Sequence, residues 1–171
     1  GEDKKNSEGF VAKYLDDKAM SQPAAAIYMA AKEISRLSVH AGKMIGAMRN
    51  AIEKRNITDI RDKYVDEHDK VKELQDIIVD FITKLISSGN LTEKQAEQAA
   101  GLMVVSNNIE RIADRCDEVD GLYKKILDNG QLLSDAAITD LTACMDMTEK
   151  LFSESMNAII TGDSETPDKV A

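Results

Sequence analysis

Four long stretches of the chain repeat hydrophobic residues at alternating steps of three and four, the spacing of a buried stripe on an α-helix. The expected helices run from about Pro23 to Lys54, Thr58 to Ser87, Glu93 to Leu127 and Asp135 to Thr161. Helices of this size are roughly 45 Å long, and short connections place successive helices antiparallel. The pattern therefore predicts an all-α fold, an elongated up-down antiparallel bundle of four long helices.

Each stripe supplies candidate core residues. They are Ile27, Ala30, Ile34, Leu37, Ala41, Met44, Met48 and Ala51 in the first helix; Ile57, Ile60, Tyr64, Val71, Leu74, Ile78, Phe81 and Leu85 in the second; Leu102, Val105, Ile109, Ile112, Cys116, Val119, Tyr123 and Ile126 in the third; and Ile138, Leu141, Met145, Thr148, Phe152, Ser155 and Ile159 in the fourth. Glu67 breaks the second stripe where an apolar residue is expected. Between the second and third helices, Gly89 is a stop signal, and Thr92 with Gln95 has the spacing of a capping box.

The charge balance limits the classes of partner. The chain of 171 residues has 22 basic and 31 acidic residues, a net charge of −9. Such a surface repels nucleic acid and anionic lipid headgroups, so we expect neither as a direct partner. It favours cations or basic protein surfaces. Cys116 and Cys144 form no zinc-binding motif, and we expect both to be buried free thiols.

Acidic residues follow the outward side of two helices. The rows are Asp59, Asp62, Asp66, Asp69, Glu73, Asp76 and Asp80 on the second helix, and Glu110, Asp114 and Asp117 on the third, where the amide Asn107 continues the row. Neighbouring like charges at this spacing cost a few tenths of a kcal/mol per pair. If the rows lie side by side, their oxygens suit a hard cation such as Mg, Ca, Mn or ferric iron. A solvated acidic face without metal is the alternative.

Motifs for catalysis are missing from the sequence. There is no HExxH, P-loop or GxGxxG, and no order of residues that suggests an activated nucleophile. A carboxylate-bridged metal enzyme would need inward-facing Glu residues and Glu-x-x-His pairs, which the stripes lack. We therefore expect a protein that is not an enzyme.

Two segments resemble a known family. "NNIERIADRCDEV", at 107–119, resembles the signature of the PhoU family of phosphate-transport regulators; the matching residues are Asn108, Glu110, Arg111, Ile112, Ala113 and Asp114. "YLDDKAMSQPAAAI", at 14–27, resembles the lead-in to the cytoplasmic PhoU-like domain at the C-terminal end of bacterial sodium/phosphate cotransporters. The resemblance extends over about 12–162.

The resemblance implies a division of the chain. Residues 1–20 would be a lead-in, 21–162 a PhoU-like helical bundle, and 163–171 a tail that opens a further helix, because family members have six helices. It also implies acid–x–x–x–acid motifs that hold metal on the bundle surface.

Only one of the two metal motifs is intact. Glu110 and Asp114 match the first. The acids of the second would fall at His68 and Lys72, and a lysine opposes a cation. An acid pair one position further round the second helix keeps the same spacing. The full set of candidate ligands is Glu110, Asp114, Asn107, Asp117, Asp69 and Glu73.

Three functions are expected, in this order. The first is a cytosolic regulatory domain of a sodium-dependent phosphate transporter, placed at the cell membrane, with the transmembrane part of the same polypeptide as its partner and self-association left open. The second is a stand-alone PhoU-type regulator that answers to a phosphate ABC transporter and its sensor kinase. The third is a helical assembly module without metal.

Overall fold

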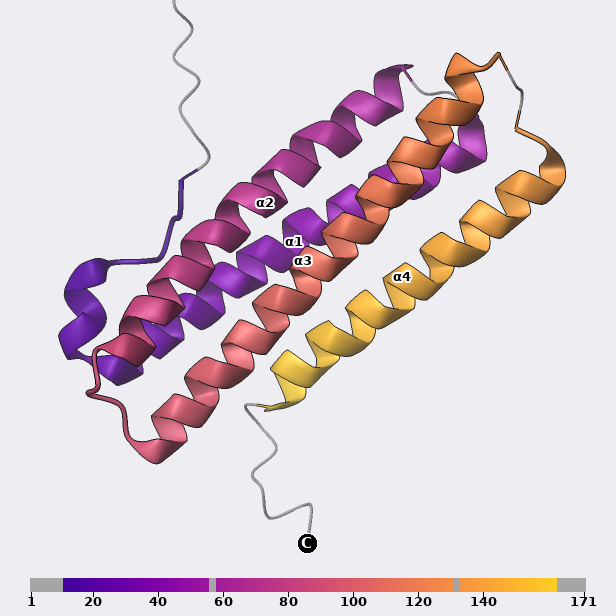
Figure 1. Cartoon of the computed structure of the whole chain (residues 1–171). Coiled ribbons are helices and arrows are strands. Elements are labelled where there is room, and N and C mark those ends of the chain that lie inside the picture. Colours follow the sequence, from indigo (N-terminus) through magenta and orange to yellow (C-terminus); the bar gives the residue numbers. More distant parts are fainter. Residues whose placement is uncertain (1–10, 56–57, 131–132, 163–171) are drawn as a thin grey trace, which may run out of the picture.

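The computed structural model describes residues 11–55, 58–130 and 133–162. It contains a short 3-10 helix, η1 (Asp17–Ser21), and four long helices, α1 (Pro23–Lys54), α2 (Thr58–Ser87), α3 (Glu93–Asp128) and α4 (Asp135–Gly162). Successive long helices run in opposite directions along one axis (Figure 1). The predicted all-α, antiparallel bundle is therefore confirmed. The predictions for Ile57 and the tail 163–171 lie outside the described residues, as do those for the side chains of Asp59, Ile60 and Ile159.

The core lies between α1, α2 and α3. Each of these helices contacts the other two, and α1 also contacts α4. The buried stripes follow the predicted ones closely; among the largest fully buried side chains are Tyr64, Tyr123, Ile34, Leu37, Met44, Leu74, Ile78 and Ile109. The Tyr123 hydroxyl donates a hydrogen bond to the carbonyl of Ala51 at 3.0 Å, which joins the end of α3 to the end of α1.

Helix α4 packs at the edge of this core. Within the described ranges it contacts α1 and α3 but not α2. Its buried side chains there are Met145 and Thr148, whereas Met147 is 70% exposed. Cys144 is also exposed, so the prediction that both cysteines are buried is wrong for this one. The reason is geometric: Cys144 precedes the inward-facing Met145 and lies on the side of α4 that no other helix covers.

Local sequence signals set the ends of the helices. The capping box is formed, because the Thr92 hydroxyl accepts from the Gln95 amide at 3.2 Å and the Gln95 side chain accepts from the Thr92 amide at 3.0 Å. Gly89 follows α2 with a positive φ of 71°, a conformation that glycine adopts without strain. Arg55 ends α1, and its guanidinium pairs with Asp135 at the start of α4.

The described part of the predicted lead-in, residues 11–20, packs on the bundle. Ala19 is buried, and Leu15 packs against the core. The carboxylate of Glu33 on α1 is fully buried and accepts the backbone N–H of Tyr14 at 2.7 Å and that of Lys13 at 3.1 Å. Glu33 thereby fixes this segment to α1. None of the described helices has the length and hydropathy needed to cross a membrane.

Candidate functional site: the contact between α2 and α3

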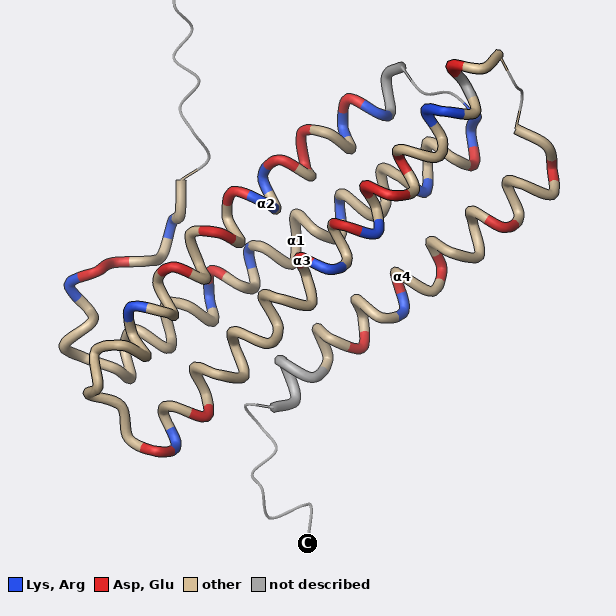
Figure 2. The backbone as a smooth tube through the Cα atoms, viewed as in Figure 1, with Lys and Arg blue, Asp and Glu red and all other residues tan. Residues whose placement is uncertain are grey.

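Charged side chains of α2 and α3 meet along one edge of the core. We call this contact the α2–α3 seam; it comprises Tyr64, His68, Lys72 and Gln75 on α2 and Glu110, Asp114 and Asp117 on α3. Steps of three and four on both antiparallel helices bring these side chains to one face. The basic and acidic residues of the two helices lie along the same stretch of the bundle (Figure 2).

A lysine lies between two of the predicted metal ligands. The Nζ atom of Lys72 is 2.7 Å from Oδ1 of Asp114 and 3.9 Å from Oε1 of Glu110. Burial lowers the pKa of Lys72, but its hydrogen bond to Asp114 and the charges of both carboxylates outweigh burial and raise it. Lys72 is therefore protonated at neutral pH, and its charge is shared by the two acids.

Asp117, the next acid along α3, is contacted by a tyrosine and a histidine of α2. Asp117 accepts a hydrogen bond from the Tyr64 hydroxyl at 2.9 Å, and its other oxygen lies 2.8 Å from Nε2 of His68. The side chain of His68 is 16% exposed, so it lies largely within the contact and not in solvent. Burial, and then the bond to Asp117, raises the pKa of Tyr64, which keeps the hydroxyl a donor.

The two ends of the seam are closed by polar side chains. At one end Gln75, which is 3% exposed, donates from Nε2 to Glu110 at 3.4 Å, while its Oε1 is buried without a hydrogen-bond partner. At the other end Arg61 makes a two-pronged contact with Asp120, at 3.0 and 3.1 Å. Such paired bonds fix the register of α2 against α3.

The structure does not bring all predicted ligands together. Glu110, Asp114 and Asp117 face α2, but Asn107 is exposed. The acid pair of α2, Asp69 and Glu73, is exposed as well, with Asp69 at 74%. Helix α2 is rotated so that Tyr64, His68 and Lys72 face α3 instead. The spacing of those three residues was visible in the sequence, one position beside the acidic row.

These side chains do not fit a hard cation as they stand. Among the described residues, no group of three or more His, Cys, Asp and Glu side chains is arranged to hold a metal ion. The ammonium of Lys72 already lies where Glu110 and Asp114 would share a cation. The predicted use of metal stays a prediction.

Glu67, the charged residue that interrupts the apolar stripe of α2, has a partner on α1. Nδ1 of His40 lies 2.6 Å from Oε2 of Glu67, and both side chains are 15% exposed. A partly buried carboxylate needs a polar partner, and His40 supplies it. Glu67 thus belongs to the α1–α2 contact although it is not apolar.

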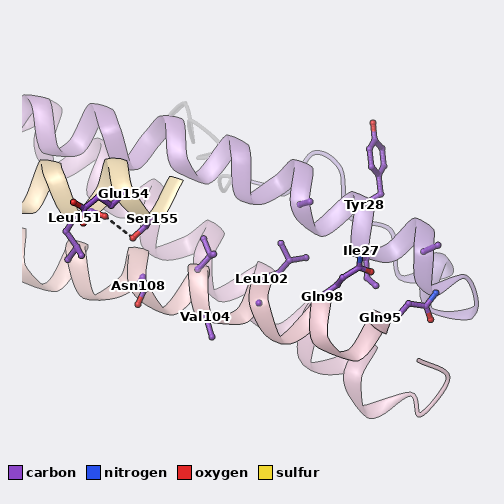
Figure 3. Close-up of a pocket in the computed structure, with 14 residues that line it drawn as sticks. Ile27, Tyr28, Gln95, Gln98, Leu102, Val104, Asn108, Leu151, Glu154 and Ser155 are labelled. Carbon is purple, nitrogen blue, oxygen red and sulfur yellow. Dashed lines mark hydrogen bonds between the residues drawn. The ribbon is translucent and has the colours of Figure 1, made fainter. Parts of the chain in front are cut away.

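A second feature is an apolar groove beside the end of α4. It has a volume of about 880 Å³ and is lined by residues of α1, α3 and α4 (Figure 3). Tyr28 is 62% exposed and Val104 58% exposed at its walls. Residues 23–31 and 98–109, which form most of the lining, carry no charged side chain. These uncharged stretches are the sequence signal that could have indicated the groove.

Comparison with known protein families gives a match that lies in the three-helix core and does not include α4. A family model described as the PhoU domain matches residues 34–119, half of the chain. The chain therefore belongs to the PhoU family. The matched range contains the whole α2–α3 seam and most of α1, and it ends before α4 begins. Comparison with curated proteins gave no match, and comparison with solved structures gave none either.

Proposed function

We propose that this chain is a regulatory domain of a sodium-dependent phosphate transporter and is joined to the transmembrane part of the same polypeptide on its cytoplasmic side. The PhoU domain itself indicates a role in phosphate-transport regulation. The proposal adds the physical connection to the transporter. In this role the domain catalyses nothing and acts through its contacts.

The observation that carries the proposal is the attachment of residues 11–20 to the bundle. The buried carboxylate of Glu33 binds two backbone amides of this segment and also receives Arg36 at 2.8 Å. Arg36 in turn donates to the carbonyl of Val11 at 3.0 Å. A segment held by such bonds moves with α1. Displacement of a connected transmembrane part would therefore reach the helical core through this segment.

Regulation also requires a surface that the transporter can reach. The groove between α1 and α3 offers apolar area from uncharged stretches, and small residues such as Gly101 in its lining allow a helix to approach closely. Exposed apolar surface of this kind marks interaction sites in soluble domains. Within the proposal, the transmembrane part contributes the contacting helix.

The connection is tested by the size and location of the native polypeptide. An antibody against this domain should detect a band far larger than 18.8 kDa in the membrane fraction of source cells. A soluble band only slightly larger would refute the tether and favour the stand-alone PhoU-type regulator. Deleting the domain from the transporter gene should then change sodium-dependent phosphate uptake.

The groove is tested by a matched pair of substitutions. Val104→Glu places a charge in the groove, and Val39→Glu places one on α1 outside its lining; the two valines are 58% and 56% exposed. We expect Val104→Glu to alter phosphate uptake with the domain still folded, as judged by circular dichroism, and Val39→Glu to leave uptake unchanged. Equal effects of the two variants would exclude the groove as the contact.

A further inference from the structure

We propose that Lys72 is a built-in counter-ion of the α2–α3 seam, so that this PhoU-family domain holds its acidic edge together without a metal ion. The proposal rests on the position of one side chain. Lys72 Nζ is bonded to Asp114 at 2.7 Å and lies 3.9 Å from Glu110, the two acids that match the metal motif.

Each acid of the seam already has a polar or basic partner on α2. Besides Lys72, His68 faces Asp117, and Arg61 binds Asp120 through two nitrogens. The acids that could have added negative charge from α2, Asp69 and Glu73, are turned to solvent. A second cation entering between Glu110 and Asp114 would therefore meet the ammonium of Lys72, with no further carboxylate from α2 to hold it.

Displacing Lys72 would not complete a coordination shell. If its side chain swung into solvent, the remaining oxygens would come from Glu110 and Asp114, with the buried amide of Gln75 beside them. Two carboxylates on a single helix leave most positions around a hard cation to water. A metal ion would have to lose bound water to reach these two carboxylates. Lys72 offsets their charge without that cost, because its ammonium is already part of the protein.

The first test uses the unmodified full chain. It is stripped with a chelator, and its thermal unfolding is followed with and without Mg²⁺, Mn²⁺ and Fe³⁺. We expect the same Tm in all four conditions. A Tm that rises with one of these ions, and no longer rises after Glu110→Gln with Asp114→Asn, would overturn the proposal.

The second test removes the lysine. Lys72→Gln takes away the positive charge beside two carboxylates, so the affinity for Mn²⁺, measured by calorimetry, should rise roughly tenfold or more. Lys70→Gln is the matched control, because Lys70 is 32% exposed against 33% for Lys72 but pairs with Asp66 outside the seam. Its Mn²⁺ affinity should equal that of the wild type.

Lys72→Arg keeps the charge and should behave as the wild type in both tests. If Lys72→Gln binds Mn²⁺ no better than Lys70→Gln does, Lys72 does not exclude the cation and the proposal fails. These readouts are metal affinity and Tm, and they do not depend on phosphate uptake. The proposal can thus fail while the regulatory function stands, and the reverse also holds.

Discussion

The helices α1, α2 and α3 form one closely packed unit, whereas α4 is attached to its side. Helix α1 buries apolar side chains from Ala26 to Ile52, but the described part of α4 buries Met145 and Thr148 alone. The PhoU match, at residues 34–119, covers most of the first region and none of the second. The three-helix core is therefore the part of this chain that carries the family match, and α4 lies at its side with its end bordering the open groove.

Polar contacts lie deeper in the three-helix core than at α4, so they differ in the same way as the apolar packing. The core encloses Glu33 with no exposed surface, and Gln75 closes the α2–α3 seam at 3% exposure. Helix α4 is joined to α1 by Arg49, which binds Asp146 at 2.6 Å and Glu149 at 2.7 Å, all with a third or more of the side chain exposed. Exposed ion pairs contribute little to stability. We therefore expect α4 to open without unfolding the core.

The largest expected difference between the two regions is in thiol reactivity. Cys116 lies in the core and Cys144 on the outer side of α4, and burial raises the pKa of Cys116 to about 12. Reaction of Cys116 requires an opening that costs about 5 kcal/mol, so it should react on the order of 10³-fold more slowly than Cys144. The variants Cys116→Ala and Cys144→Ser, each with one thiol left, allow both rates to be measured with a disulfide reagent. Similar rates would show that Cys116 is reached without a costly opening of the core and would remove the distinction.

Truncating one leucine in each region compares their packing. Leu74→Ala, in the core at 0% exposure, should lower the free energy of unfolding by about 3 kcal/mol because it leaves a cavity. Leu151→Ala, on α4 at 42% exposure, should lower it by less than about 1 kcal/mol. Urea titrations followed by circular dichroism measure both. A loss for Leu151→Ala as large as that for Leu74→Ala would mean that α4 is part of the core.

The attachment of residues 11–20 should contribute to stability as the core does, because it depends on the buried carboxylate of Glu33. Glu33→Gln removes the charge that faces Arg36 and leaves one oxygen to accept from the backbone, so we expect a loss of about 2 kcal/mol in the free energy of unfolding. Glu53→Gln is the matched control on the same helix, because Glu53 is 51% exposed and pairs with Arg49, which is itself 35% exposed. It should change the unfolding midpoint little. Faster amide exchange of residues 13 and 14 in Glu33→Gln would localise the effect; unchanged exchange there would exclude Glu33 as the anchor.

Much of the fold could be predicted because it depends on local sequence. The period of the stripes gave α1 and α2 their bounds, and the capping box marked the start of α3. The sequence also placed Asn107, Glu110, Asp114 and Asp117 on α3 away from its apolar stripe, and none of the four is buried. These predictions succeed because periodicity and capping act within one helix.

The rest depends on how helices are rotated against each other. His68 and Asp69 lie about 100° apart around α2, so the rotation of α2 against α3 decides which of them faces Asp117, and it is His68. The exposure of Cys144 likewise depends on which helices cover α4. The spacing within one helix does not name the partner across the contact, because that partner is set by packing between residues that are distant in sequence.

The smallest expected effect compares the first turns of α3 and α4. The Thr92 hydroxyl caps α3 at 3.2 Å from the Gln95 amide, and the Ser134 hydroxyl caps α4 at 3.1 Å from the Ala137 amide. Replacing either residue with alanine removes about 1 kcal/mol from its own helix. For Thr92→Ala this loss should appear in the global unfolding midpoint, since α3 unfolds with the core.

For Ser134→Ala the midpoint should hardly move, because the loss is confined to an element that opens by itself. It should appear instead as faster amide exchange along α4 with unchanged exchange in α2. The two caps have nearly the same geometry, so a difference in where the loss is detected reports only the coupling of each helix to the core. If both variants lowered the global midpoint equally, α4 would unfold together with α1, α2 and α3.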